Sequence, residues 1–117
     1  MLSRETGQVA EQRALVYLKQ QGLKLITTNY LTRFGEIDLI MRDGDVLVFT
    51  EVRMRSRADF GGAGASITRT KQAKLVKTAQ QYLMQFNRPP ACRFDAVLLG
   101  ATSDGTIEWI RDAFSAD

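Results

Sequence analysis

The segment Gly35–Arg53, which reads GEIDLIMRDGDVLVFTEVR, decides the fold because its pattern contains a complete β-hairpin. Apolar runs flank an Asp43-Gly44 pair, and Asp-Gly is a strong signal for a two-residue hairpin turn with positive φ at both positions. We expect this turn to pair Arg42 with Asp45, so that the numbers of paired residues sum to 87. The segment therefore predicts two antiparallel strands in a defined register.

This register divides the hairpin side chains between two sides. One side is apolar and packs on a core, with the pairs Met41–Val46, Leu39–Val48 and Ile37–Thr50. The other is apolar near the turn and acidic at the far end, with the pairs Ile40–Leu47, Asp38–Phe49 and Glu36–Glu51, and with Arg53 beyond them. A three-residue loop would instead put Asp38 and Glu51 on opposite sides.

The acidic end of the hairpin predicts a cation site. Asp38 and Glu51 become diagonal neighbours within reach of one small ion, and Glu36 directly opposite Glu51 destabilises the sheet unless a counter-ion is present. The alternative is a solvated strand end, which is common for acidic residues. The spacing favours a divalent metal site that serves phosphodiester cleavage.

The residue types that are missing restrict the chemistry. Histidine is absent, which excludes a Ser-His-Asp triad, a His general base and His-ligated zinc. The single cysteine, Cys92, excludes a thiolate zinc site. Any metal must therefore be a hard ion with oxygen ligands, Mg²⁺ or Mn²⁺.

Length and composition predict a single domain, residues 1–117, with one modest core. No apolar run approaches the roughly 20 residues of a membrane span, and the N-terminus lacks a secretory apolar stretch. Cys92 cannot form an internal disulfide, which suits a reducing compartment. We therefore expect a cytoplasmic protein without a membrane partner.

Positive charge is concentrated in residues 52–80. This segment contains seven basic residues and one acidic residue, Asp59, which gives a local net charge of +6. A basic field beside a carboxylate cluster suits a polyanion, so nucleic acid is the expected partner, and a solubilising surface is the alternative. The basic residues are Arg53, Arg55, Arg57, Arg69, Lys71, Lys74 and Lys77.

Helical spacing predicts a first helix from Ser3 to Gln21, which Gly22 ends. Glu11 lies in the middle of its packing stripe, where a carboxylate is costly unless it has a partner. Three interpretations stay open: Glu11 pairs with a cation such as Arg53, it reaches a metal, or it points into solvent at the edge of the stripe.

The remaining pattern predicts an α/β fold, a mixed sheet of about five strands flanked by two helices. A short strand covers residues 23–26, and a glycine-containing loop covers 56–66. A second helix from Thr68 to Phe86 carries Lys71, Lys74 and Lys77 on one edge. Strands follow at 93–99 and 107–110, and the second helix allows a parallel, right-handed crossover between the third and fourth strands.

These motifs resemble the YraN family of small bacterial proteins, which is similar to Holliday-junction resolvases and to the wider restriction-endonuclease-like superfamily. The resemblance covers nearly the whole chain. It rests on GEIDLI at 35–40, VFTEVR at 48–53, Ser-Ile-Thr-x-x-Lys at 66–71, Arg-Phe-Asp at 93–95 and Gly7-x-x-x-Glu11-x-x-Ala14.

The resemblance implies a metal-dependent endonuclease that acts on nucleic acid, with branched DNA favoured and a homodimer as its form. Asp38 matches the motif Asp and Glu51 the motif acid, Glu11 matches a helix-borne Glu, and Arg53 occupies the motif Lys position. These residues and Glu36 form the expected site, with Asp38, Glu51 and Glu11 as Mg²⁺ or Mn²⁺ ligands. Phosphate contacts are expected from Arg55, Arg57, Lys71 and Lys74.

Arg53 departs from the superfamily motif, because a Lys can shift its pKa and help to deprotonate the attacking water, whereas an Arg stays protonated. Arg53 can still hold the scissile phosphate. Two alternatives to an active nuclease therefore remain: a catalytically weak or inactive nucleic-acid-binding protein of the same fold, and a structural or adaptor protein whose carboxylates bind only water.

Overall fold

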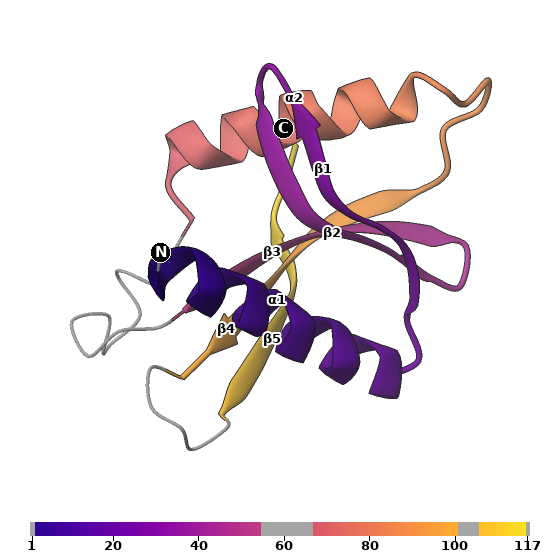
Figure 1. Cartoon of the computed structure of the whole chain (residues 1–117). Helices are drawn as coiled ribbons and strands as arrows, with labels where there is room; N and C mark the ends of the chain where they lie inside the picture. Colours follow the sequence, from indigo (N-terminus) through magenta and orange to yellow (C-terminus); the bar gives the residue numbers. More distant parts are fainter. Residues whose placement is uncertain (1, 55–66, 101–105, 117) are drawn as a thin grey trace.

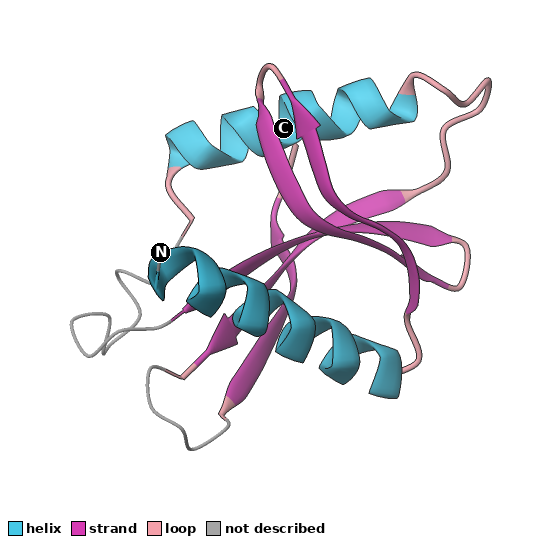
Figure 2. Cartoon of the chain, viewed as in Figure 1, coloured by secondary structure: helices cyan, strands magenta, loops and turns pink. Residues whose placement is uncertain are grey.

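The computed structural model describes residues 2–54, 67–100 and 106–116. The described chain forms one five-stranded mixed sheet in the order β1-β2-β3-β4-β5, with one helix against each face (Figures 1 and 2). This confirms an α/β fold with two helices around about five strands. The elements are α1 (Leu2–Gln20), β1 (Lys24–Thr32), β2 (Gly35–Asp43), β3 (Val46–Met54), α2 (Arg69–Leu83), β4 (Cys92–Leu99) and β5 (Ile107–Phe114).

Both helices start and stop near the predicted residues. At the end of α1, the Gly22 N–H donates to the Lys19 carbonyl (3.0 Å) and the Leu23 N–H to the Leu18 carbonyl (3.1 Å). This is a Schellman cap, which needs the left-handed conformation that Gly22 adopts at φ 100°. At the start of α2, the side chain of Thr68 accepts the N–H of Lys71 (3.2 Å).

Helix α2 connects two parallel strands. Strand β3 pairs with β4 in parallel from Leu47–Cys92 to Met54–Leu99, while all the other strand pairs are antiparallel. The predicted parallel crossover is therefore confirmed. Among the described residues, neither helix is both long and apolar enough to cross a membrane.

The register of the hairpin differs from the prediction. Leu39 pairs with Thr50 and Asp43 with Val46, so paired numbers sum to 89 and the predicted Glu36–Glu51 pair is wrong. The turn residues are Gly44 and Asp45, and of these only Gly44 has a positive φ (61°), a pattern typical of a type II′ turn with Gly first. The difference of two preserves the alternation over the paired residues Leu39–Asp43 and Val46–Thr50, so those side chains keep their predicted sides.

The two faces of the sheet form separate cores. Under α1, Leu18, Leu39, Met41, Val48 and Val97 pack together with several smaller neighbours. Under α2, the cluster contains Ile37, Ile40, Leu47, Phe49, Phe94 and Leu75 with their neighbours. Ile37 and Leu39 would share a face in a regular strand, so their separation shows that β2 bends between them.

Strand β1 is longer than predicted and contains a residue with a positive φ angle beside the bend in β2. It reaches Thr32 rather than Ile26, and it pairs with β2 along most of that length. Thr28 pairs with Leu39 and Tyr30 with Ile37, while Asn29 between them has a positive φ of 51°. Asn tolerates this conformation better than most residues. The β1–β2 register itself shifts between Leu25 and Thr27.

A buried carboxylate joins β4 to β5. Asp95 is 1% exposed and accepts hydrogen bonds from the Arg93 Nε, the Trp109 Nε1 and the Asp112 N–H, each 2.9 Å long. Asp112 has a positive φ of 53°, and the β4–β5 register shifts beside it. The Asp95 carboxylate thus satisfies a backbone donor at this irregularity and pairs with a guanidinium.

Replacing Asp95 with Asn should lower the free energy of unfolding by about 3 kcal/mol, because a buried carboxylate with three donors is lost and the half-buried Arg93 keeps only Asp43 as an acidic partner. Urea denaturation measures the change. The matched control is Asp45→Asn at the exposed hairpin turn, which should stay within about 0.5 kcal/mol of wild type. Equal stability of the two variants would contradict a structural role for Asp95.

Candidate metal and nucleic-acid site

Strand β2 leaves β3 at Asp38. The β2–β3 pairing ends at Leu39–Thr50, and beyond it β2 continues beside β1 alone. The Val52 N–H, which would otherwise lose a strand partner, donates to Asp38 Oδ2 at 2.8 Å. The carboxylate therefore replaces backbone pairing at the point where the strands separate, and the separation opens room for other side chains.

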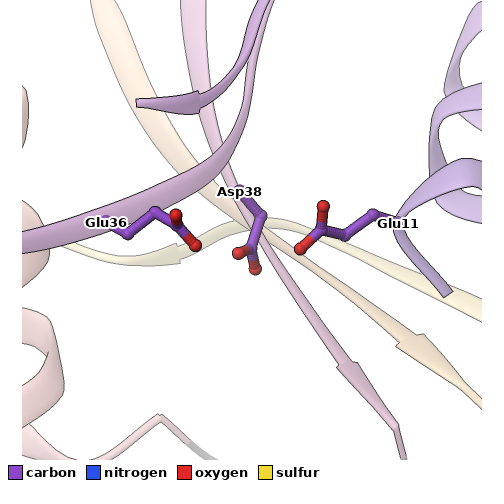
Figure 3. A group of neighbouring side chains, drawn as sticks. All are labelled: Glu11, Glu36 and Asp38. Carbon is purple, nitrogen blue, oxygen red and sulfur yellow. The ribbon is translucent and has the colours of Figure 1, made fainter. Parts of the chain in front are cut away.

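Three carboxylates meet at this separation. Glu11 comes from α1, and Glu36 and Asp38 come from the start of β2; one oxygen of each lies within 4.8 Å of the others. Glu11 and Glu36 extend toward Asp38 from opposite sides (Figure 3). Glu11 is partly exposed, and its carboxylate accepts a hydrogen bond from Asn29 beside Glu36 and Asp38.

Glu51 joins the cluster from β3 and is only 7% exposed. It lies close enough to Asp38 to raise the pKa of that carboxyl, and its Oε2 lies 3.2 Å from Lys71 Nζ. Residues of β3 and α2 surround Asp38 and Glu51 in a cleft of about 600 Å³. The cleft is lined by Asp38, Glu51, Val52, Arg53, Met54, Thr68 and Lys71.

The carboxyl groups of this cluster favour their protonated forms over their ionised forms. Burial raises the pKa of Asp38 to about 8, with further contributions from its hydrogen bond and repulsion with Glu51. Burial, with repulsion from neighbouring carboxylates, also raises the pKa values of Glu11 and Glu36. Lys71 is the ammonium group described in contact with the cluster, yet the pKa values of Asp38, Glu11 and Glu36 stay raised, so a bound cation could take the place of their protons.

Asn29 is a part of the site that the sequence did not indicate. Its Nδ2 donates to Glu11 Oε1 at 3.0 Å, and it also forms a hydrogen bond with Glu36. It lies opposite Asp38 in the β1–β2 register, between the pairs Thr28–Leu39 and Tyr30–Ile37. No periodic pattern around residue 29 signals this role, because the contact arises from the bend in the hairpin.

The donor set fits a hard divalent ion. Two oxygens on opposite sides of Mg²⁺ are about 4.2 Å apart, twice a ligand distance of about 2.1 Å. The carboxylate oxygens of Glu11, Glu36 and Asp38 already lie within 4.8 Å of one another, so small side-chain shifts would bring them into range. Carboxylate ligands also suit Mg²⁺ and Mn²⁺ chemically.

The structure brings most of the predicted site residues together. Asp38, Glu51, Arg53 and Lys71 line one cleft, and Glu11 and Glu36 lie beside Asp38. Lys71 contacts Glu51, so it lies at the carboxylates themselves. Lys74 is exposed on α2, while Arg55 and Arg57 lie outside the described residues.

The raised pKa of Asp38 gives a pH dependence. Between pH 3.8, its ordinary value, and about 8, the folded protein holds a proton that the unfolded chain releases, so metal-free stability should fall as pH rises through this window. Glu11 and Glu36 contribute in the same direction. Urea denaturation across this range should give a shallower slope for Asp38→Asn, whereas Asp45→Asn should follow wild type. Identical slopes for Asp38→Asn and wild type would contradict the assignment.

Comparisons with known proteins place this geometry in a family. Residues 10–99 match the family described as "Uncharacterised protein family UPF0102". A UPF0102 protein of Nitrosospira multiformis is 52% identical over 117 residues, which cover 100% of this chain and 98% of the relative. One from Nitrosomonas europaea is 56% identical over 108 residues (92% of each chain), and one from Psychromonas ingrahamii is 53% identical over 112 residues (96% and 91%). The chain therefore belongs to the UPF0102 family.

Proposed function

We propose that this protein is a metal-dependent endonuclease that hydrolyses phosphodiester bonds in nucleic acid, with branched DNA as the favoured substrate. One observation carries the proposal: carboxylates from α1, β2 and β3 converge beside Lys71 and Arg53 in and around one cleft. A carboxylate cluster that holds protons for lack of a cation, adjacent to basic groups, matches the needs of a metal ion and a phosphate.

The carboxylates divide into ligands and supporting groups. Asp38 and Glu51 would hold the ion, Glu11 would bind it directly or through water, and Glu36 would act as a supporting or second-ion carboxylate. When bound, Mg²⁺ or Mn²⁺ polarises the phosphoryl oxygen and lowers the pKa of a bound water. Asn29 keeps Glu11 oriented through its 3.0 Å hydrogen bond.

The basic groups act on the phosphate. Arg53 and Lys71 line the cleft from β3 and α2, where their positive charges can hold a scissile phosphate and offset charge that develops during hydrolysis. Lys71 already lies near Glu51, so it would be available at the carboxylates when an ion enters. Lys74 continues the basic edge of α2 for a flanking phosphate.

The resemblance to Holliday-junction resolvases supports the choice of branched DNA and of a homodimer as the active form. The fold and the conjunction of Asp38, Glu51 and Glu11 are compatible with the restriction-endonuclease-like superfamily. The lone Cys92 and the reducing environment it suits favour the cytoplasm as the place of action.

The second candidate is a nucleic-acid-binding protein of the same fold that cleaves slowly or not at all. Arg53 favours it, because an arginine at the motif Lys position cannot give up a proton to activate water. The two candidates share the metal and DNA surfaces, so a cleavage assay separates them.

Removing a ligand should abolish metal binding and cleavage together. Asp38→Asn and Glu51→Gln should lose the Mn²⁺-binding heat in calorimetry and slow the cleavage of DNA junctions by at least about 100-fold, since even groups behind metal ligands matter by 10–100-fold. Asp45→Asn is the matched control and should behave as wild type. Equal cleavage by wild type and Asp38→Asn would indicate contamination, and Mn²⁺ binding without cleavage would favour the second candidate.

Charge reversal on α2 should weaken DNA binding through the phosphates. Lys74→Glu should reduce affinity for duplex DNA and lower the slope of log affinity against log salt by about 1, because one phosphate contact is lost. Fluorescence anisotropy at several salt concentrations measures both. The control is Lys24→Glu, at the β1 position that pairs with Arg42. An unchanged slope for Lys74→Glu would place the binding surface elsewhere.

A further inference from the structure

A basic hollow lies between the β1–β2 turn and α2, separate from the carboxylate cleft. Its volume is about 1010 Å³, at the upper end of the roughly 300–1,000 Å³ typical of small-molecule pockets. The one aromatic ring in its wall belongs to Phe34, at the turn. The lining residues are Arg33, Phe34, Lys77, Gln80, Gln81 and Met84.

Two cations lie over the ring. The Arg33 guanidinium carbon lies 4.8 Å from the centroid of the Phe34 ring, and Lys77 Nζ lies 5.8 Å from it. Within residues 2–54, 67–100 and 106–116, neither cation forms an ion pair with a carboxylate. An aromatic face beside cations without acidic partners has the composition of a site that stacks a base and binds its phosphate.

The turn that carries Phe34 is fixed against α2. Thr32 Oγ1 accepts the Phe34 N–H at 3.1 Å and lies 3.3 Å from Thr78 Oγ1 on the helix. The rings of Tyr30 and Tyr82 pack edge to face with centroids 5.3 Å apart. These contacts hold the turn before a ligand arrives, so little entropy is lost when a base stacks on the ring.

The hollow lies a short distance from the carboxylates along two elements. Phe34 precedes Asp38 by four residues, which corresponds to about 13 Å of extended strand. Lys77 follows Lys71 by six residues, a rise of about 9 Å along the helix. Both distances span about three to four nucleotides of a stacked strand, which rises about 3.4 Å per nucleotide.

We propose that Phe34 stacks an unpaired base of the nucleic-acid strand, about three to four nucleotides from the phosphate held at Asp38 and Glu51, with Arg33 and Lys77 on the adjoining phosphates. The inference deepens the proposed function and rests on it for the polyanionic substrate. It narrows that substrate to strands with unpaired nucleotides next to the cleavage position, because a paired base has no free face to offer.

Anisotropy binding assays with the full chain and no added divalent metal test the stack without cleavage. Phe34→Ala should weaken binding of a short single-stranded DNA by about 5- to 100-fold, the range for loss of one base–aromatic stack, and should change binding of a blunt duplex by less than twofold. Phe34→Leu, which retains apolar bulk, should show the same selective loss. Phe34→Trp should bind single strands at least as tightly as wild type.

Two controls make the result specific. Met84→Ala removes an exposed side chain from the same hollow without touching the ring, and it should bind both DNAs as wild type does. The fluorescence of 2-aminopurine, placed at successive positions of the single strand, should change on binding at one position in wild type and at none in Phe34→Leu.

The outcomes separate this inference from the nuclease proposal. Selective loss of single-strand binding supports the stack even if wild type cleaves nothing, in which case only the nuclease proposal fails. Equal single-strand binding by Phe34→Leu and wild type, equal losses for single strand and duplex, or no single-strand binding by wild type would each overturn the stack. Cleavage of junctions by wild type would then leave the nuclease proposal intact.

Discussion

The hydrogen bond from the Val52 N–H to the Asp38 carboxylate is the constraint on which the arrangement depends. A buried backbone donor needs a partner, so β2 can part from β3 only where something else accepts that N–H. Asp38 supplies the acceptor from its own side chain. The separation that follows admits Glu11 and Glu51 to one space and directs the β1–β2 turn toward α2 (Figure 1).

Opposite charges are thereby placed on either side of one opening. The carboxylates come from α1 and the hairpin, whereas α2 contributes Arg69, Lys71, Lys74 and Lys77 and has no acidic residue. Only Lys71 is close enough to pair with a carboxylate of the cluster in the described structure. The remaining cations keep their charge available for a polyanion, and the cluster keeps its shortage of positive charge.

The sequence alone predicted the structure correctly where the alternation of strand side chains or a helix cap determines it. The sides of Asp38 and Glu51 were predicted correctly although the register was not, because an error of two positions preserves a period of two. The predicted hairpin register was wrong because Gly44 occupies the first turn position rather than the second. The C-terminal end of α1 followed from Gly22, whose effect is local, and the predicted start of the second helix at Thr68 agrees with α2.

The other features of the site depend on contacts between distant parts of the chain, so the sequence could not predict them. Ile37 leaves the face of Leu39 because the strand bends, and no residue pattern near it indicates a bend. Asn29 and Phe34 gained their positions from that same bend and from packing on α2, so they look like ordinary polar and turn residues in the sequence. Glu11 was ambiguous for a related reason: its partners lie on β1 and β2, far away in the chain.

The irregularity at Asp112 has a consequence for the outer edge of the sheet. An edge strand presents unpaired backbone groups that can recruit another chain and extend into an aggregate. At β5, the positive φ of Asp112 turns its N–H inward to Asp95, which interrupts the row of outward-facing groups. The hydrogen bond from Asp112 to the buried Asp95 carboxylate thus also disfavours pairing of β5 with the edge strand of another molecule.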